Sequence, residues 1–281
     1  MLLSIYAMGR KITYLSQAVR ASLSLSLLMT TIALSLLCAS CTGVAVKGEP
    51  QKGINLPSER EEIEFGHYVD AAIQNDFVVL LPSENHWLYQ KISQIGMSLV
   101  KVSDRPRLKY TFRILNTPLV NAFAGPGGYI YITTGLIEFA EDIDEIAGVM
   151  AHELGHVCAR HAVKQFRNVN YATAILFPIL VASKAYGYSW AGDLSQLAAV
   201  FFLMGYSRDY ERQADYLAVK YMIRAGYRPE AMISFLERLW EEKEKGRKAD
   251  LLGVFFSSHP HTQERIRYIK EYIKELKGER R

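Results

Sequence analysis

Five consecutive residues near the middle of the chain, His152-Glu153-Leu154-Gly155-His156, constrain its fold and chemistry more than any other stretch. On a helix, residues four apart lie about 40° from each other around the axis, so the two imidazoles share a face one turn apart. Two histidines placed in this way can bind one Zn²⁺, and the glutamate between them can act as a catalytic base. The alternative is two packed histidines and a surface glutamate. The spacing favours a zinc site on a helix.

A catalytic zinc site needs one more protein ligand, because such sites have three protein ligands and leave a position open for water. The best donor is the stretch 206–215, which begins a second helix that is expected to end near Gly226. Glu211 and Asp215 are four residues apart there and share a face. We expect Glu211 to bind the metal through one oxygen and Asp215 to accept the N–H of a ligand histidine.

The helix that carries the two histidines is expected to begin at Asp142, with Glu145 three residues later, and to run to about Gln165. On a helix of that length, His161 is about 180° round the axis from His152. It cannot then join the same metal, and it is expected to pack behind the site. Other helices are expected from the spacing of apolar residues at 60–74, after a cap at Ser83, from Pro229 to Lys243 and over 266–276.

Three short strands are expected between residues 108 and 133. Leu108–Leu115 alternates apolar and polar residues, and the stretches Asn121-Ala122-Phe123-Ala124 and Tyr129–Thr133 flank a glycine-rich turn at 125–128. A strand beside a zinc helix can bind an extended peptide by edge pairing. The segment 121–124 is therefore a candidate substrate-binding strand, and an ordinary inner strand is the alternative. The sequence favours neither.

These pieces together resemble the M48 family of zinc metallopeptidases. The resemblance rests on 152–156, Ser207-Arg208, Glu211 to Ala214-Asp215, the stretch 121–128, and His259-Pro260 with Glu264-Arg265-Ile266, and it covers roughly residues 60–275. It implies an α+β fold of the gluzincin type, mainly helical, with a small β-sheet beside the H-E-x-x-H helix.

The resemblance also implies a role for each site residue. One zinc ion per chain would be bound by His152, His156 and Glu211, with Glu153 as the base and Asp215 supporting a ligand histidine. The histidine of the family's H-P motif matches His259, which would lie over the zinc and either stabilise the oxyanion or cap the metal at rest. From spacing alone, His259 and His261 rank equally. Arg265 is expected to make a structural ion pair.

The N-terminus has the pattern of a targeting segment. Basic residues precede an apolar stretch at 23–37, and small residues at 39 and 40 precede Cys41, as in a bacterial lipobox, although Cys38 stands where that pattern usually has leucine. We expect a signal peptide at 1–40, a lipid on Cys41, a tether at 41–60 and one metallopeptidase domain at 61–281. An uncleaved signal anchor and plain signal cleavage are the alternatives. Cys158 then remains as a small buried packing residue.

This segment places the chain in the cell envelope of a bacterium, on the periplasmic side, and Thr42 weakly favours the outer membrane because an aspartate there commonly marks retention at the inner membrane. Within the family, the lipobox makes the chain most similar to the BepA-like periplasmic lipoproteins. The net charge of +4 is mild and spread out, so it gives no signal for nucleic acid. Two apolar runs at 171–205 are expected to form a buried helical hairpin, or alternatively a mobile lid or a membrane-facing surface.

The predicted function is hydrolysis of peptide bonds in misfolded or misassembled envelope proteins, bound in an extended conformation. A second hypothesis is a chaperone-like binding factor for envelope assembly whose protease site is restrained by His259. A zinc hydrolase of non-peptide substrates is a third and weaker one.

Overall fold

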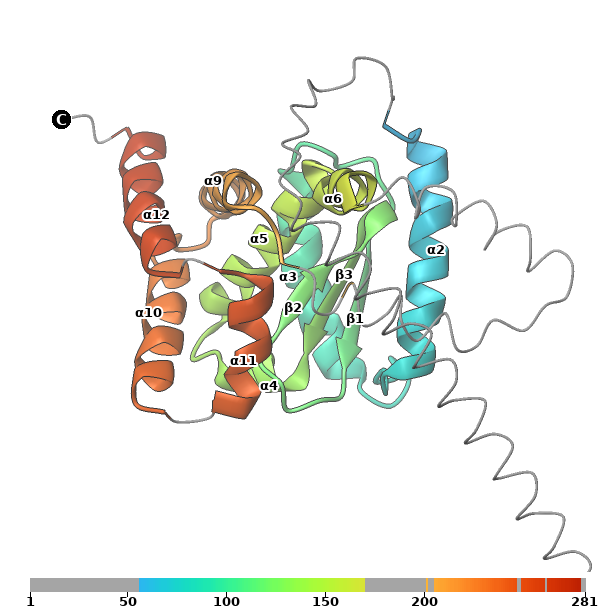
Figure 1. The fold of residues 1–281 in the computed structure, drawn as a ribbon, viewed down its shortest axis with the longest axis horizontal. Coiled ribbons are helices and arrows are strands. Elements are labelled where there is room, and N and C mark those ends of the chain that lie inside the picture. Colours follow the sequence, from blue (N-terminus) through green and yellow to red (C-terminus); the bar gives the residue numbers. More distant parts are fainter. Residues whose placement is uncertain (1–55, 170–200, 202–204, 247–248, 261, 279–281) are drawn as a thin grey trace, which may run out of the picture. The chain divides into compact units, whose positions relative to one another are not determined.

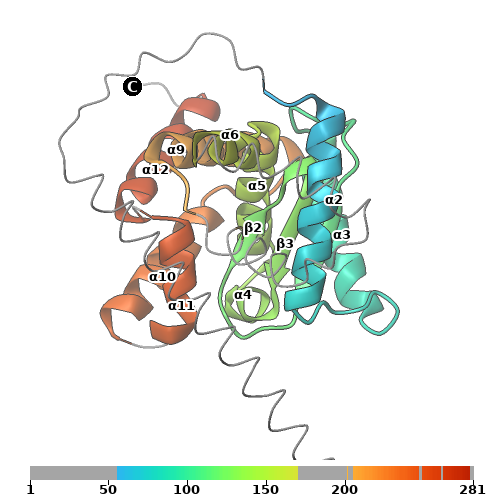
Figure 2. The same ribbon diagram turned by 45° about the vertical axis from the view of Figure 1, so that its right-hand side comes forward.

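Helix α5 (Ile143–Cys158), which carries the H-E-x-x-H stretch, lies beside a small β-sheet and among several other helices (Figures 1 and 2). It packs against strands of the sheet and against α3, α9 and α10. The structure is a computed structural model that describes residues 56–169, 201, 205–246, 249–260 and 262–278. Within these residues the fold is mainly helical with one small sheet next to α5, which confirms the expected α+β class.

The other elements follow one another along the chain in the order in which they are numbered. The helices are α2 (Glu59–Asp76), α3 (His86–Lys101), α4 (Thr134–Phe139), α6 (His161–Val169), α9 (Arg208–Ala225), α10 (Ala231–Glu244), α11 (Ala249–Ser258) and α12 (Thr262–Leu276). The strands are β1 (Thr111–Leu115), β2 (Ala122–Ala124) and β3 (Tyr129–Thr133), and a short 3₁₀ turn, η1 (Pro126–Gly128), precedes β3.

The sheet has its strands in the order β1-β3-β2. Strand β1 runs parallel to β3, and β2 runs antiparallel to it, with Phe123 opposite Tyr131. The strands expected at 121–124 and 129–133 are confirmed, whereas the first strand begins at Thr111 rather than at Leu108. Since β3 lies between the other two, β2 is an edge strand of the sheet formed by the described residues. Within these residues the topology favours the edge strand over the inner-strand alternative.

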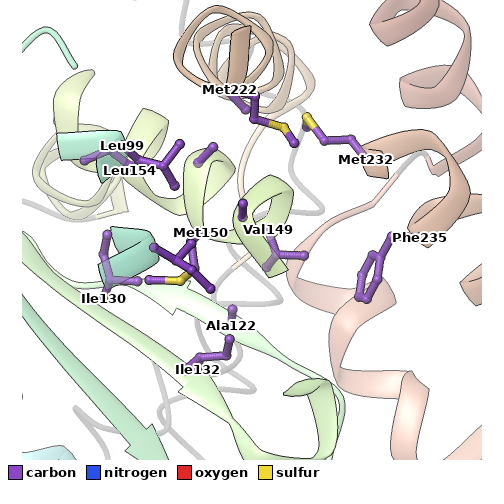
Figure 3. Close-up of a cluster of buried hydrophobic side chains, with 14 of the residues drawn as sticks. Leu99, Ala122, Ile130, Ile132, Val149, Met150, Leu154, Met222, Met232 and Phe235 are labelled. Atoms are coloured by element: carbon purple, nitrogen blue, oxygen red, sulfur yellow. The ribbon is translucent and has the colours of Figure 1, made fainter. Parts of the chain in front are cut away.

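Apolar side chains hold α5 in place between the sheet and the neighbouring helices (Figure 3). Val149, Met150 and Leu154 belong to one buried cluster with Ile130 of β3 and Phe235 of α10. Burying a side chain of this size stabilises a fold by roughly 1.5–3 kcal/mol. The helix that presents the histidines is thus anchored by core packing along its length.

The predicted continuation of α5 beyond Cys158 to Gln165 is wrong. The helix ends at Cys158, Arg160 has a left-handed φ of 57°, and α6 begins in a new direction. A left-handed φ is unfavourable for a residue with a side chain, so tertiary contacts must offset its cost. Glu62 of α2 provides one of them, because its carboxylate lies 2.8 Å from Arg160 Nε. The corner brings the start of α6 back towards the end of α5.

Helix α9 has the ends that its sequence predicts. The Ser207 hydroxyl accepts the N–H of Tyr210 at 3.4 Å, and Gly226 ends the helix with a left-handed φ of 83°. Close packing against α5 depends on Gly155, since a Cβ added there would lie 2.8 Å from the carbonyl oxygen of Ala214. The glycine inside the H-E-x-x-H stretch therefore lets the two helices that carry the candidate ligands approach each other.

Some helix boundaries differ from those predicted. The residue before α3 is Asn85 rather than Ser83, because residues 81–85 first form a turn that is closed on the Leu81 carbonyl. Helix α10 begins at Ala231 rather than at Pro229. Helices α4 and α11 are not predicted. The six residues of α4 are too few to show a periodic pattern.

Cys158 is half-buried rather than buried, and its thiol is free. The expected signal peptide and the expected hairpin at 171–205, apart from Phe201 and Gly205, lie outside the described residues, as does His261. The expected tether at 41–60 also lies outside them except for its last five residues, and α2 already begins at Glu59. None of the helices in the described part of the chain has the length and apolar character that a bilayer span requires.

Candidate metal centre

Two imidazoles of α5 and one carboxylate of α9 meet at a buried point. His152 Nε2 lies 3.0 Å from His156 Nε2. Of the two carboxylate oxygens of Glu211, Oε2 lies 3.5 Å from His152 Nε2 and Oε1 lies 3.3 Å from His156 Nε2. Ligand atoms about 2.1 Å from a tetrahedral zinc ion are about 3.4 Å apart. All three side chains are at most 3% exposed. Their geometry fits three ligands of one metal ion.

His259, which follows α11, lies next to this group. Its Nδ1 is 3.5 Å from a Glu211 oxygen, and its Nε2 is 3.5 Å from a Glu153 oxygen and 3.2 Å from the carbonyl oxygen of Ala122. With His152, His156 and Glu211 it forms a cluster whose possible ligand atoms all lie within 4.8 Å of one another. His259 is thus close enough either to approach a metal or to face a substrate beside it.

The buried charges of the site match a divalent cation. Glu153, Glu211 and Asp215 are at most 1% exposed, and Arg265 is 2% exposed. When all four are ionised, three negative charges face one positive charge, and an unpaired buried charge is very unfavourable. Both oxygens of Glu153 and of Glu211 also accept no hydrogen bond from the described residues. A bound divalent metal would offset the excess negative charge, and two imidazoles with a carboxylate are ligands that zinc accepts.

The surroundings of Glu153, Glu211 and His152 shift the pKa values of these groups in different directions. Burial raises the pKa of Glu153, against the opposing effect of His259. For Glu211 burial acts in the same direction, but Arg265 and His152 hold its pKa well below the usual range. Burial and Arg265 lower the pKa of His152, yet Asp215 and Glu211 outweigh them and raise it to about 9. In a metal-free cluster, a proton on His152 thus offsets part of the negative charge that a metal would balance.

Asp215 joins the metal cluster to Arg265 of α12. Its Oδ1 lies 2.8 Å from His152 Nδ1, which leaves the Nε2 of that ring facing the cluster. The Arg265 guanidinium donates two hydrogen bonds to the Asp215 carboxylate, at 2.7 and 2.8 Å, and lies 3.1 Å from a Glu211 oxygen. Arg265 therefore forms an ion pair, as expected, but inside the candidate site, where the sequence did not place it.

Three further residues lie near the cluster, and the sequence predicts the place of only one of them, His161, which packs behind the site as expected. His161 Nδ1 lies 2.9 Å from His156 Nδ1, and Gln213 lies beyond it. Tyr206 stacks on the ring of His156 at a centroid distance of 4.1 Å. The contact between His161 and His156 depends on the corner at Arg160, and no local sequence pattern predicts that corner. For Tyr206, the one available sequence signal is its position just before the helix that carries Glu211, which could have indicated an aromatic residue next to the site.

The candidate substrate strand lies beside this site. Its residues, Asn121, Ala122, Phe123 and Ala124, are at most 3% exposed. The Asn121 side-chain oxygen accepts a hydrogen bond from Ser258, the residue before His259, at 3.2 Å. Together with the contact of His259 on the Ala122 carbonyl, this bond holds the end of α11 against β2.

A small apolar hollow, with a cavity volume of about 20 Å³, opens next to His152 and Glu153. Helices α5, α10, α11 and α12 contribute its walls. The lining residues are Gly148, Val149, His152, Glu153, Met232, Phe235, Leu236, Phe255 and Arg265. The cavity combines a mostly hydrophobic wall with the polar groups of the metal cluster at one end, which is the usual composition of a ligand pocket.

Two histidines and a glutamate on one helix, with a carboxylate ligand from a second helix, are the arrangement of a metallopeptidase site. Comparison of the sequence with known families agrees, since residues 83–273 match peptidase family M48. This match covers more than half of the 281 residues. The chain belongs to peptidase family M48, which confirms the family resemblance.

Curated relatives come from mitochondria and from bacteria. The chain is 30% identical over 190 residues to the mitochondrial metalloendopeptidase OMA1 of Schizosaccharomyces pombe, which covers 67% of this chain and 54% of that protein. It is 28% identical over 161 residues to the beta-barrel assembly-enhancing protease of Escherichia coli K12, which covers 55% of this chain and 33% of that protein. The chain thus spans about half the length of these relatives or less.

Proposed function

We propose that this protein is a zinc-dependent endopeptidase. The observation that carries the proposal is the buried group of His152, His156 and Glu211, with the oxygens of Glu153 beside it. A bound zinc ion supplies Lewis acidity, which acidifies water and polarises a carbonyl group. The cluster fits such an ion in ligand type, in spacing and in charge.

Glu153 is the proton carrier of the proposed reaction. Its carboxylate takes a proton from the attacking water and later delivers it to the leaving amine. Burial raises the pKa of Glu153, and a pKa nearer to neutrality suits a group that must both accept and release a proton. The absence of hydrogen bonds to its oxygens from the described residues leaves them available for this exchange.

His259 and strand β2 face the substrate in this proposal. His259 can donate a hydrogen bond to the developing oxyanion, because its Nε2 lies only 3.5 Å from the base. The segment Asn121–Ala124, at the edge of the sheet, would hold a polypeptide in an extended conformation. The small hollow between Val149 and Phe255 would take a small apolar group of that polypeptide.

Removal of the metal is expected to abolish hydrolysis. A chelator such as 1,10-phenanthroline should eliminate cleavage of an unfolded protein such as casein, and zinc should restore it at one ion per chain. The reason is that His152, His156 and Glu211, with His259 beside them, form one cluster with room for one ion. Metal content and cleavage are measured on the same samples. Full activity in protein shown to contain no metal would contradict the proposal.

We propose further that the protein works in the bacterial cell envelope, anchored on the periplasmic side by a lipid on Cys41, with a slight preference for the outer membrane. The support is the basic and apolar leader and the small residues before that cysteine. Its substrates would be misfolded or misassembled envelope proteins. The name of the bacterial relative refers to β-barrel assembly and is in keeping with such substrates, whereas the mitochondrial relatives are named for a different compartment.

Lipidation at Cys41 predicts a simple labelling result. Cells that express the full chain with labelled palmitate should incorporate the label into the wild type and into Cys38→Ser, but not into Cys41→Ser. Cys38 is the matched control because it lies three residues away in the same leader. Label that survives in Cys41→Ser would exclude this anchor.

A second candidate function is a binding factor for envelope assembly with a restrained protease site. The observation that favours it is the position of His259, whose ring nitrogen belongs to the potential ligand cluster and could cap the metal. This role needs no chemistry from Glu153. Full rescue of an envelope assembly defect by Glu153→Gln would favour binding, whereas rescue only by proteins that retain Glu153 would favour proteolysis.

A further inference from the structure

His161 lies directly behind one of the two candidate histidine ligands. Its Nδ1 is 2.9 Å from His156 Nδ1, on the side of that ring that faces away from His152 and Glu211. The His161 side chain is fully buried, and its ring stacks on Tyr210 at a centroid distance of 4.3 Å. Its other nitrogen, Nε2, is 3.0 Å from the side-chain oxygen of Gln213. Both ring nitrogens of His161 therefore have a partner.

These contacts determine where each proton lies. A histidine that binds a metal through Nε2 carries its proton on Nδ1, so His156 must donate from Nδ1. His161 Nδ1 must then accept this hydrogen bond, which leaves the proton of a neutral His161 on Nε2. That proton points to Gln213 Oε1, which is an acceptor. The two hydrogen bonds thus run in the same direction: His156 donates to His161, and His161 donates to Gln213.

The two candidate histidine ligands have different supports. His152 Nδ1 faces a carboxylate, Asp215, at 2.8 Å, whereas His156 Nδ1 faces a neutral imidazole. A partner behind a ligand histidine fixes the tautomer and the orientation of the ring and raises its basicity. Gln213 and Asp215 both lie on α9, the helix that also supplies Glu211. One helix therefore provides a ligand and backs both histidines.

The fold places His161 there by the corner between α5 and α6. Glu62 is 1% exposed and holds Arg160 at 2.8 Å and Arg105 at 3.0 Å. Arg105 also donates to the carbonyl oxygen of Val157 at 3.2 Å, so the end of α5 is fixed on the same side. The position of His161 is thus built by several buried contacts rather than by a free loop.

We propose that His161 is a positioning residue that holds His156 as the tautomer with its proton on Nδ1, and that Gln213 in turn fixes the tautomer of His161. The inference rests on the proposed zinc site. It predicts that zinc affinity depends on an acceptor at the His161 Nδ1 position and can be tuned from residue 213.

The decisive comparison is between His161→Phe and His161→Asn. Phenylalanine keeps a ring that can stack on Tyr210 but leaves the His156 N–H without an acceptor, whereas the asparagine oxygen can occupy nearly the position of the lost Nδ1. We expect His161→Phe to weaken zinc binding about 10–100-fold and His161→Asn to stay within a few fold of the wild type. The affinity is measured by competition with a chromophoric chelator, and folding of the metal-free variants is checked by circular dichroism.

Two further variants keep the test decisive. Gln213→Glu replaces a neutral acceptor by a charged one and should tighten zinc binding, even if His161→Phe fails to fold. His67→Phe is the matched control, because His67 also bonds through Nδ1, here to the Tyr129 hydroxyl at 2.8 Å, but lies outside the cluster. Equal losses in His161→Phe and His161→Asn, or unchanged or weaker binding in Gln213→Glu, would overturn the inference. A wild type that binds no zinc would instead refute the proposed function.

Discussion

Replacement of Glu153 by glutamine is expected to abolish peptide hydrolysis while zinc stays bound. Glutamine has nearly the same shape but cannot take a proton from water, and the same carboxylate is proposed to act as base and as acid. General acid–base catalysis contributes typically about 10²–10⁴-fold, so a fall in kcat of at least about 10³-fold is expected. The measurements are kcat on an unfolded protein substrate and zinc content by elemental analysis.

The matched control for this variant is Glu138→Gln on α4, since that glutamate is exposed and lies outside the metal cluster. It should change neither kcat nor zinc content. Because His152, His156 and Glu211 supply the proposed ligands, Glu153→Gln should bind zinc as tightly as the wild type to within a few fold. Undiminished cleavage by Glu153→Gln would remove Glu153 from the mechanism, and loss of zinc in this variant would mean that Glu153 is a ligand.

The parts of the site that the sequence predicts are those that depend on local geometry. His152 and His156 share a helix face because they are one turn apart, and the same holds for Glu211 and Asp215. Both helices also carry local signals for their ends, namely the caps at 142 and 207 and the glycine at 226. The sequence therefore predicts each half of the cluster, and the structure shows that the two halves meet.

The remainder depends on contacts between distant residues, which periodicity cannot reveal. Arg160 takes a left-handed conformation that nothing in its neighbourhood requires, and its partner Glu62 lies about a hundred positions earlier. This corner overturns the predicted long helix and brings His161 to the site. Arg265 is likewise placed by the packing of α12 on α9, so its role inside the cluster was not readable from the sequence.

The buried charges tie catalysis and stability together. Arg265 is the positive side chain that contacts both Asp215 and Glu211 in the described structure, at 2.7 and 3.1 Å. Asp215 in turn holds His152, and Glu211 faces both histidines. With zinc bound, two positive charges and the guanidinium balance three carboxylates. Loss of the guanidinium would leave one carboxylate uncompensated inside the protein.

Arg265→Met is therefore expected to lower the free energy of unfolding of the zinc-loaded protein by about 3–5 kcal/mol, the usual cost of removing one partner of a buried ion pair. Methionine retains much of the length of the side chain, so the effect reports mainly the charge. The matched control is Arg208→Met, whose ion pair with Glu264 at 3.5 Å is exposed and should contribute at most about 1 kcal/mol. Urea denaturation with zinc present measures both variants. If the two losses are equal, the buried charge balance does not stabilise this fold.

Adding Asp215→Asn to Arg265→Met should recover part of the loss, because it removes the carboxylate that the first change leaves unpaired.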